Sequence, residues 1–408
     1  MSTIEKVVIV GAGQAGFQVA ASLRQGGFEG SVVIIGDEHN APYQRPPLSK
    51  AYLKSLADET SIQLRPEGFY VDNRIELIRG DKVESIDRSN KVVVTESGKQ
   101  FSYDKLAITT GTRPRPLELP GAELPGVHAL RSFLHAANLR DELQSYENIV
   151  IIGGGFIGLE VAACAAGLGK AVTVLEYAPR LMGRAVSTIS SDFFKAYHES
   201  IGVKVITDAR MERIVGTDRA QAVALSSGTQ IPCDLILVGV GALPNVELAQ
   251  AAGLDCDNGI LVDEYAVTSD QNILSAGDCS NHPNAYANGR FRLESVQNAI
   301  DQAKVAASTM LGNSSPYHAA PWFWSDQGEI KLQTVGLPLG TDELVVRGSV
   351  EDRKFSVFHY REGKLIAVES INSAGDHMVA RKLITTGISP SPAKVSDSAI
   401  ELKSLLAG

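Results

Sequence analysis

The sequence predicts an α/β protein built around two similar parallel-sheet units, and three observations support this prediction. A glycine-rich turn between an apolar strand and a helix occurs twice, starting at Gly11 and at Gly153. Each turn and its helix are followed by a second apolar strand, as in a βαβ unit. A third region, from about residue 315, contains several strand-like runs followed by a helix expected at about 374–383.

The two units are copies of one supersecondary pattern. KVVIVGAGQAGFQVAASL begins at Lys6, and NIVIIGGGFIGLEVAACA begins at Asn148. In both, the first strand is a continuous run of β-branched residues, typical of a parallel strand that is buried on both faces. Second strands are expected at 32–35 and 172–175. Between about 70 and 110, the runs IELI, KVESID, KVVVTES and KQFSYDKLAIT predict an antiparallel meander inserted in the first copy.

Length, composition and charge narrow the class of protein. A chain of 408 residues predicts roughly two to three domains, and 44% hydrophobic with 21% charged residues indicates a folded globular protein. The net charge of −9 argues against a general nucleic-acid role. The apolar run VVIV breaks at Gly11, so neither a signal peptide nor a membrane span is expected.

The four cysteines predict neither a metal site nor a disulfide scaffold. No two of them form a C-x-x-C pair, and their spacing does not fit a zinc ribbon; they are Cys164, Cys233, Cys256 and Cys279. Small buried thiols in a reducing compartment are the simplest interpretation, so we expect a cytoplasmic protein without a bound metal.

The glycine turns predict binding of two dinucleotides. In G-x-G-x-x-G the first glycine makes the tight turn, the second lets the backbone approach a pyrophosphate, and the third allows close helix packing. The pyrophosphate then lies at the positive end of the helix. Two such sites in one chain favour a flavin and a nicotinamide nucleotide, here FAD and NAD(H). The glycines are Gly11, Gly13 and Gly16 in the first copy and Gly153, Gly155 and Gly158 in the second.

Each copy carries an acid that is expected to bind an adenine ribose. Glu176 directly follows VTVL and favours NADH, because a 2′-phosphate beside its carboxylate would be repelled; Arg180 and Arg184 nearby would soften this preference. In the first copy Gly36 follows the strand, so the acid is one residue later, at Asp37. The alternatives are that Glu38 binds the ribose instead, or that these acids only belong to a solvated turn.

Seven blocks follow one another along the chain: YQRPPLSKAYL, TTGTRPR, GGGFIGLE, VGVGALPN, SAGDCS, RLESVQNAIDQA and PWFWSDQ. Together they resemble the FAD-dependent NADH:ferredoxin reductase family, which includes reductases for putidaredoxin and for the ferredoxin of biphenyl dioxygenase. The resemblance covers essentially the whole chain and implies a glutathione-reductase-like fold with two Rossmann-type dinucleotide-binding domains and a C-terminal α/β domain. It implies an FAD domain of residues 1–113 and 244–314, an NADH domain of 114–243 and a C-terminal domain of 315–408.

The resemblance also implies site residues. Lys50 and Glu160 are expected together near the flavin N5, where a lysine stabilises the reduced cofactor; a purely structural ion pair is the alternative. Asp278 is expected to bind ribityl hydroxyls, unless it is only a turn acid. Three further residues are expected to contact FAD, with ordinary core packing as the alternative interpretation: Val83, Val296 and Trp324. The expected FAD contacts are Gly11, Gly13, Ala15, Gly16, Asp37, Lys50, Val83, Arg131, Asp278, Val296 and Trp324, and the expected NAD contacts are Gly153, Gly155, Ile157, Gly158, Glu176 and Gly241.

The absence of redox thiols near the expected flavin bears on where the electrons go after the flavin. The chain has PPLSK where disulfide reductases carry a redox thiol, and it has no cysteine before Cys164. Electrons are therefore expected to leave the flavin for a partner, one at a time. The resemblance implies that this partner is a two-iron ferredoxin that feeds a monooxygenase or dioxygenase. A monomer or weak dimer is expected, without nucleic-acid or membrane partners. The alternatives are a rubredoxin reductase, an NADH oxidase, or an NADH-sensing flavoprotein like apoptosis-inducing factor.

Overall fold

The computed structural model describes residues 4–407, and residue contacts divide the chain into two units. Both units contain a parallel sheet with helices, which confirms the predicted α/β fold class. The three domains with breaks near 113, 243 and 314 stay a prediction. Unit 1 comprises the residues up to Gln44 with Glu59–Arg113 and Leu243–Pro321, and unit 2 comprises Arg45–Asp58, Pro114–Ala242 and the residues from Trp322 on.

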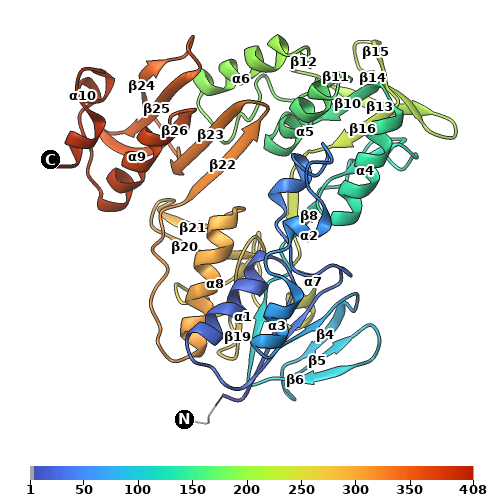
Figure 1. Cartoon of the computed structure of the whole chain (residues 1–408), viewed down its shortest axis with the longest axis vertical. Helices are drawn as coiled ribbons and strands as arrows, with labels where there is room; N and C mark the ends of the chain where they lie inside the picture. The colour runs from blue at the N-terminus through green and yellow to red at the C-terminus, as the bar shows by residue number, and fades with distance from the viewer. Residues whose placement is uncertain (1–3, 408) are drawn as a thin grey trace. The chain divides into compact units, whose positions relative to one another are not determined.

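Unit 1 is centred on a five-stranded parallel sheet in the order β19-β7-β1-β2-β3. Val7 and Ile9 of β1 pack on the face that carries helices α1 and α8, which lie side by side in both views (Figure 1). Val8 and Val10 pack into the core on the opposite face. Burial on both faces therefore explains the unbroken apolar run. The bounds are β1 Lys6–Val10, α1 Gln14–Gln25, β2 Ser31–Ile35, β3 Ile75–Ile78, β7 Lys105–Ile108, β19 Ile273–Ser275 and α8 Val296–Met310.

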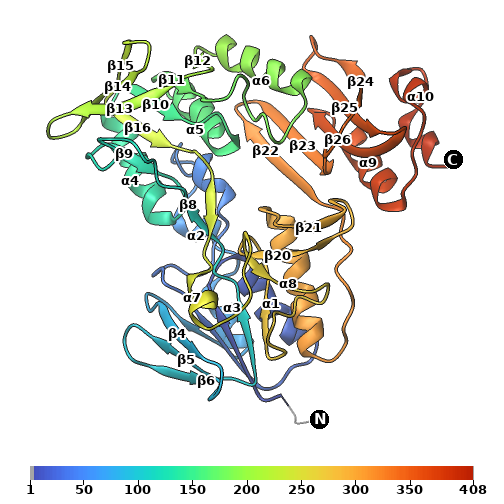
Figure 2. The same cartoon turned by 180° about the vertical axis from the view of Figure 1, so that it is seen from behind.

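The predicted meander is wrong for two of its runs. IELI forms β3 and pairs in parallel with β2, and KLAI forms β7 and pairs in parallel with β1. Leu106, Ala107 and Ile108 are buried consecutively, as in a strand that is covered on both faces. Only the segments between them form an antiparallel sheet (Figure 2), made of β4 (Val83–Asp87), β5 (Val92–Thr95) and β6 (Gln100–Ser102).

The rest of unit 1 consists of short elements. A small sheet has the order β18-β20-β21. The bounds are α2 Glu59–Ile62, α3 Glu67–Asp72, α7 Glu247–Ala251, β18 Ile260–Leu261, β20 Ser280–Asn284 and β21 Gly289–Phe291. Short strands β8 (Thr112–Pro114) and β17 (Ala242–Pro244), at the two points where the chain changes unit, form a separate two-stranded sheet.

Unit 2 repeats the pattern of unit 1, as the sequence predicts. Its parallel sheet has the order β12-β11-β10-β16-β9, and an antiparallel sheet β13-β14-β15 packs against the same core as β10 and β16. The bounds are β9 Val127–Ala129, α4 Phe133–Ser145, β10 Asn148–Ile152, α5 Phe156–Gly167, β11 Ala171–Leu175, α6 Thr188–Ser200, β12 Lys204–Ile206, β13 Met211–Gly216, β14 Ala220–Leu225, β15 Gln230–Pro232 and β16 Leu235–Val238.

The C-terminal part of unit 2 is an antiparallel sheet in the order β22-β23-β26-β25-β24, with α9 packed against β23 and β26. The predicted strands and the helix that follows them are confirmed. Among residues 4–407, no helix combines the length and the apolar character needed to cross a membrane. The bounds are η1 Pro46–Ser49, β22 Trp322–Gln327, β23 Ile330–Gly336, β24 Glu343–Ser349, β25 Lys354–Arg361, β26 Lys364–Ile371, α9 Ala374–Thr386, α10 Pro392–Ser396 and η2 Leu402–Ala407.

Candidate functional site

The first glycine turn has the geometry that its motif requires. Gly11 has a φ of +108°, and a Cβ there would lie 2.3 Å from the backbone oxygen of Thr109. A Cβ on Gly16 would lie 2.0 Å from the oxygen of Gly11, so the third glycine lets α1 pack on the turn. A Cβ on Gly13, in contrast, would meet no atom within 4 Å. The middle glycine therefore faces open space, where a pyrophosphate approaches the backbone.

The second turn repeats this geometry in unit 2. Gly153 has a φ of +108°, and its Cβ would lie 2.4 Å from the oxygen of Gly239. A Cβ on Gly158 would lie 2.4 Å from the oxygen of Gly153, while one on Gly155 would meet nothing within 4 Å. The close contacts and the open face thus fall on the same motif positions in both copies.

Helices α1 and α5 begin in a way that fits a phosphate ligand. Their N-cap residues, Gly13 and Gly155, provide no side-chain hydrogen bond to the helix, and neither helix has an acid in its first turn. The first backbone N–H groups of a helix have no partner within the helix, and its positive end attracts anions. The residues present therefore fit two dinucleotides.

Glu176 directly follows β11, and backbone N–H groups hold its side chain in place. Its carboxylate accepts a hydrogen bond of 2.6 Å from the N–H of Gly154 and one of 2.7 Å from the N–H of Ala178. The acid thus lies at the glycine turn of unit 2, in an orientation set by two donors. Of the other residues predicted to contact NAD, Ile157 is 46% exposed in the first turn of α5. Gly241 has a φ of +110° and open space where a Cβ would be.

The structure explains why the acid of the first copy comes one residue late. A Cβ on Gly36 would lie 2.5 Å from the Cβ of Ala12, so glycine lets the end of β2 approach the turn. Asp37, the next residue, is exposed. Glu38 is half-buried, and its carboxylate accepts a hydrogen bond of 2.7 Å from the Tyr43 hydroxyl. Of these two acids, Asp37 therefore presents the more accessible carboxylate.

Asp278 stands in a turn that lies against the start of α1. Gly277 has a φ of +86°, and its Cβ would be 3.0 Å from the Cβ of Ala15. The Gly277 N–H donates a 2.8 Å hydrogen bond to the side-chain oxygen of Gln302 in α8. This approach brings Asp278, Ala15 and the first glycine turn together within unit 1.

The other residues predicted to contact FAD are spread over both units. Val83 is buried in the unit 1 core at the start of β4, and Val296 is the half-buried first residue of α8. Lys50, Arg131 and Trp324 belong to unit 2. The backbone oxygen of Arg131 accepts a 2.7 Å hydrogen bond from Arg45. Trp324 lies on β22, with its ring centroid 5.6 Å from that of Trp322.

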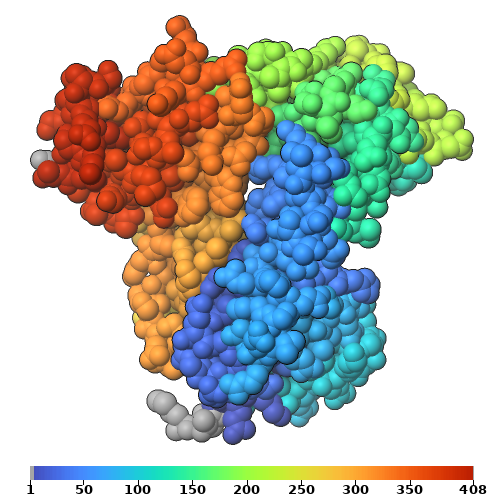
Figure 3. Space-filling view, in the orientation of Figure 1, coloured from blue at the N-terminus to red at the C-terminus, as the bar shows by residue number. Residues whose placement is uncertain are grey.

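Lys50 and Glu160 form an ion pair, with 2.9 Å between Nζ and Oε1. The segment Arg45–Asp58 contains η1, which contacts α4 and α5 of the same unit; Figure 3 shows this segment in blue beside their green atoms. The Glu160 side chain is only 6% exposed and also accepts hydrogen bonds from the hydroxyls of Ser49 and Ser325. Sequence reasoning missed both serines, although each stands inside a quoted block.

The cysteines offer no thiol pair in the described part of the chain. All four are free, and only Cys256 is partly exposed. Cys164 lies one turn after Glu160 on α5, with its sulfur 3.9 Å from the backbone oxygen of Lys50. Burial raises the pKa of the Cys164 thiol to about 11, so near neutral pH it carries a proton and is a poor nucleophile.

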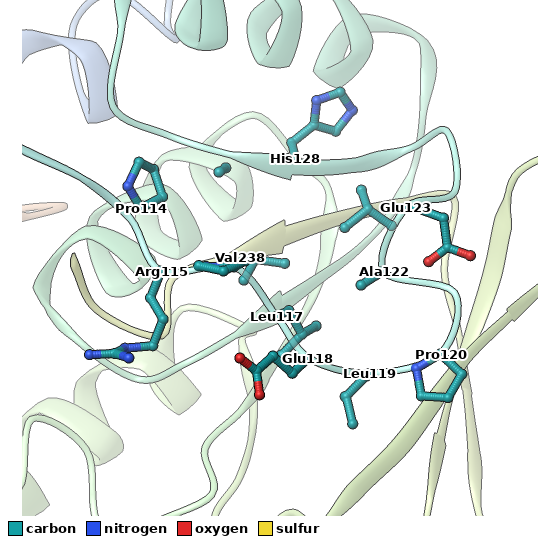
Figure 4. Close-up of a pocket in the computed structure, with 13 residues that line it drawn as sticks. Pro114, Arg115, Leu117, Glu118, Leu119, Pro120, Ala122, Glu123, His128 and Val238 are labelled. Atoms are coloured by element: carbon teal, nitrogen blue, oxygen red, sulfur yellow. The ribbon is translucent and has the colours of Figure 1, made fainter. Parts of the chain in front are cut away.

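A pocket of about 600 Å³ in unit 2 lies apart from these residues. It is lined mainly by a Pro-rich connection, residues 114–126, and Leu117, Ala122 and Val238 are among its lining residues (Figure 4). The lining residues include none of the predicted site residues. The apolar side chains of the connection pack on the core of β10 and β16, which anchors this segment to unit 2.

Two glycine turns, each between a parallel strand and a helix and each followed by an acid, define an oxidoreductase that binds two dinucleotides. Residues 5–303 match the family model described as pyridine nucleotide-disulphide oxidoreductase, and residues 322–406 match the one described as reductase C-terminal. The chain belongs to the pyridine nucleotide-disulphide oxidoreductase family.

Similar proteins include several redox-partner reductases. Rhodocoxin reductase of Rhodococcus erythropolis is 46% identical over 98% of this chain and 94% of its own length. A rubredoxin-NAD(+) reductase of Ectopseudomonas oleovorans is 42% identical over 90% of this chain and 95% of its own length.

Two solved structures share the fold over nearly all of both chains. A ferredoxin reductase of the CYP199A2 system from Rhodopseudomonas palustris has a TM-score of 0.96 and 47% identity, and it covers 98% of each chain. The reductase in a covalent putidaredoxin reductase–putidaredoxin complex has a TM-score of 0.96 and 38% identity, and it covers 99% of this chain and 98% of that chain. These matches confirm the predicted family and an FAD- and NAD(H)-dependent oxidoreductase.

Proposed function

We propose that this chain is an NADH-dependent ferredoxin reductase. When bound, FAD supplies the chemistry that converts hydride transfer from NADH into the delivery of single electrons. The acceptor is a two-iron ferredoxin that serves a monooxygenase or dioxygenase. The observation that carries the proposal is the combination of two open glycine turns with a Lys50–Glu160 pair whose carboxylate is buried, and no thiol pair among residues 4–407. The unpaired thiols also support a cytoplasmic location.

The chain's residues divide the binding work between the two cofactors. In the proposed FAD domain, residues 1–113 and 244–314, the turn at Gly13 and the start of α1 hold the pyrophosphate, Asp37 the ribose, and Asp278 the ribityl chain. In the proposed NADH domain, residues 114–243, the turn at Gly155 holds the pyrophosphate and Glu176 the ribose. The remaining residues that we assign are Gly11, Ala15, Gly16, Val83, Arg131, Val296 and Trp324 for FAD, and Gly153, Ile157, Gly158 and Gly241 for NADH.

Lys50 and Glu160 are the residues to which we assign the catalytic role. The Lys50 ammonium stabilises the negative charge of the reduced cofactor, and Glu160 holds that ammonium in place. A carboxylate that is only 6% exposed gives this attraction little competition from water. Helix α5, which carries Glu160, begins at the NADH turn, so one helix connects nucleotide binding with the pair.

Rubredoxin is the second candidate acceptor, because a rubredoxin-NAD(+) reductase is among the similar proteins. The test is steady-state NADH oxidation by the purified FAD-loaded enzyme with a two-iron ferredoxin, with rubredoxin, and with oxygen alone. Cytochrome c serves as the final electron acceptor, and we expect its reduction to depend on added ferredoxin. Turnover only with rubredoxin or only with oxygen would exclude the proposed acceptor, and slow flavin reduction without turnover would favour an NADH sensor.

A further inference from the structure

The carboxylate of Glu160 has a separate hydroxyl donor on each oxygen. Ser325 Oγ donates to Oε1 over 2.7 Å, and Lys50 Nζ lies 2.9 Å from the same oxygen. Ser49 Oγ donates to the other oxygen, Oε2, over 2.5 Å. Two donors on different oxygens fix the rotation of the carboxylate plane, which one donor alone would leave free.

Both serine side chains are enclosed by protein. Ser49 is 5% exposed and Ser325 is 0% exposed, so water has little access to replace either hydroxyl. Each hydroxyl also has a weaker second contact: Ser49 with the backbone oxygen of Pro46 at 3.3 Å, and Ser325 with the amide of Gln327 at 3.4 Å. The shorter bonds to Glu160 therefore dominate their orientation.

The two serines belong to elements that are separate from α5. Ser49 ends η1 and immediately precedes Lys50, while Ser325 lies on β22 of the C-terminal sheet. On β22, Ser325 shares a face with Phe323, whose ring centroid lies 4.6 Å from that of Phe156 at the start of α5. Residues from two other segments of unit 2 thus converge on the carboxylate that α5 carries.

We propose that Ser49 and Ser325 are positioning residues that set the orientation of Glu160 and, through it, the place of the Lys50 ammonium. This inference rests on the proposed function of the Lys50–Glu160 pair. The ammonium is at the end of a flexible side chain that is 20% exposed, so its position depends on where Oε1 lies. A small displacement of a charged group at a reacting centre lowers the rate without a matching loss of substrate binding.

The test is anaerobic stopped-flow reduction of the bound FAD over a range of NADH concentrations. The variants are Ser49→Ala, Ser325→Ala and Glu160→Gln, with each serine change also made in the Glu160→Gln background. Ser356→Ala is the matched control, because this buried serine of unit 2 hydrogen-bonds Ser370 and Asp376, away from the pair. FAD content is measured for every variant to show that the protein is folded.

We expect each serine variant to lower the limiting reduction rate about tenfold, with the NADH dissociation constant unchanged. In the Glu160→Gln background the serine changes should add little, because they act through Glu160. The inference is overturned if Glu160→Gln is slow while both serine variants reduce at the wild-type rate, if the serine effects are undiminished in that background, or if Ser356→Ala is equally slow. A wild-type rate in Glu160→Gln itself would instead remove Glu160 from the proposed function.

Discussion

The backbone N–H of Gly154 donates a 2.6 Å hydrogen bond to the carboxylate of Glu176, so the acid that follows β11 is tied to the turn that precedes α5. A carboxylate held in this way cannot easily swing away from a nucleotide that binds on the turn. Its negative charge is therefore a fixed feature of the predicted NADH site. This relationship gives the predicted preference for NADH over NADPH a structural cause.

Replacing Glu176 by arginine should reverse the cofactor preference. Repulsion between the carboxylate and a 2′-phosphate 4 Å away is up to about 4 kcal/mol at an effective dielectric of 20. We expect Glu176→Arg to raise the ratio of kcat/KM for NADPH to that for NADH by about 100-fold. Steady-state kinetics with both nucleotides measure it. Glu212→Arg, the same charge change at an exposed position on β13, should leave the ratio unchanged.

Alanine substitutions at two glycines of the first turn should have different effects, one on stability and the other on FAD binding. Gly11→Ala places a Cβ 2.3 Å from the Thr109 oxygen at a φ of +108°, so we expect loss of stability. Gly13→Ala meets no protein atom within 4 Å, so we expect a folded protein with weakened FAD binding. Thermal unfolding and the flavin content of purified protein check the two expectations. Full FAD content in Gly13→Ala would show that the open face is not used.

Removing the thiol of Cys164 should leave electron transfer intact. Because burial raises its pKa to about 11, the thiol stays protonated near neutral pH. We expect Cys164→Ala to turn over with ferredoxin within about twofold of the wild-type rate, apart from a small packing loss. Pretreatment with iodoacetamide at pH 7.5 should have equally little effect. A loss of turnover in both experiments would point to a thiol relay and against direct transfer.

Two buried histidines should make the protein less stable in acid. Burial lowers the pKa of His377 and of His282 from 6.5 to about 4. The unfolded chain takes up these protons near pH 6.5, whereas the folded one does so only near pH 4, so the unfolded state binds more protons between these values. The free energy of unfolding should therefore fall by about 2 kcal/mol per histidine between pH 7 and pH 5.

Urea unfolding at pH 7 and pH 5 measures this loss. His377→Gln should be less sensitive to the pH change than the wild-type protein, because the titrating group is gone. The same substitution at the exposed His39 serves as the control. An equal pH dependence in wild-type protein and His377→Gln would refute the contribution of that histidine.

Features that depend on neighbours in the chain could be predicted from the sequence. The glycine turns are local: Gly11 has a positive φ, and a Cβ on Gly16 would meet the backbone oxygen of Gly11 in the same turn. Glu176 directly follows a strand, and parallel strands place such residues at one edge of the sheet. The family resemblance supplied the Lys50–Glu160 pair, which spacing alone does not predict.

Features that depend on distant partners could not be predicted. Ser49 and Ser325 lie 111 and 165 residues from Glu160, and nothing in their local sequence marks them as its partners. The pairing of β7 with β1 was misassigned for the same reason, since short apolar strands do not reveal whether their neighbour is parallel.

The central claim is that the Lys50–Glu160 pair promotes hydride transfer from NADH to FAD, and Lys50→Met tests it most directly. The measurement is the limiting rate of FAD reduction by NADH in anaerobic stopped-flow. Lys170→Met is the matched control, because Lys170 forms another 2.9 Å ion pair of unit 2, with Glu147. We predict a fall of about 100-fold for Lys50→Met and none for Lys170→Met. A wild-type rate in Lys50→Met that retains its FAD would contradict the claim.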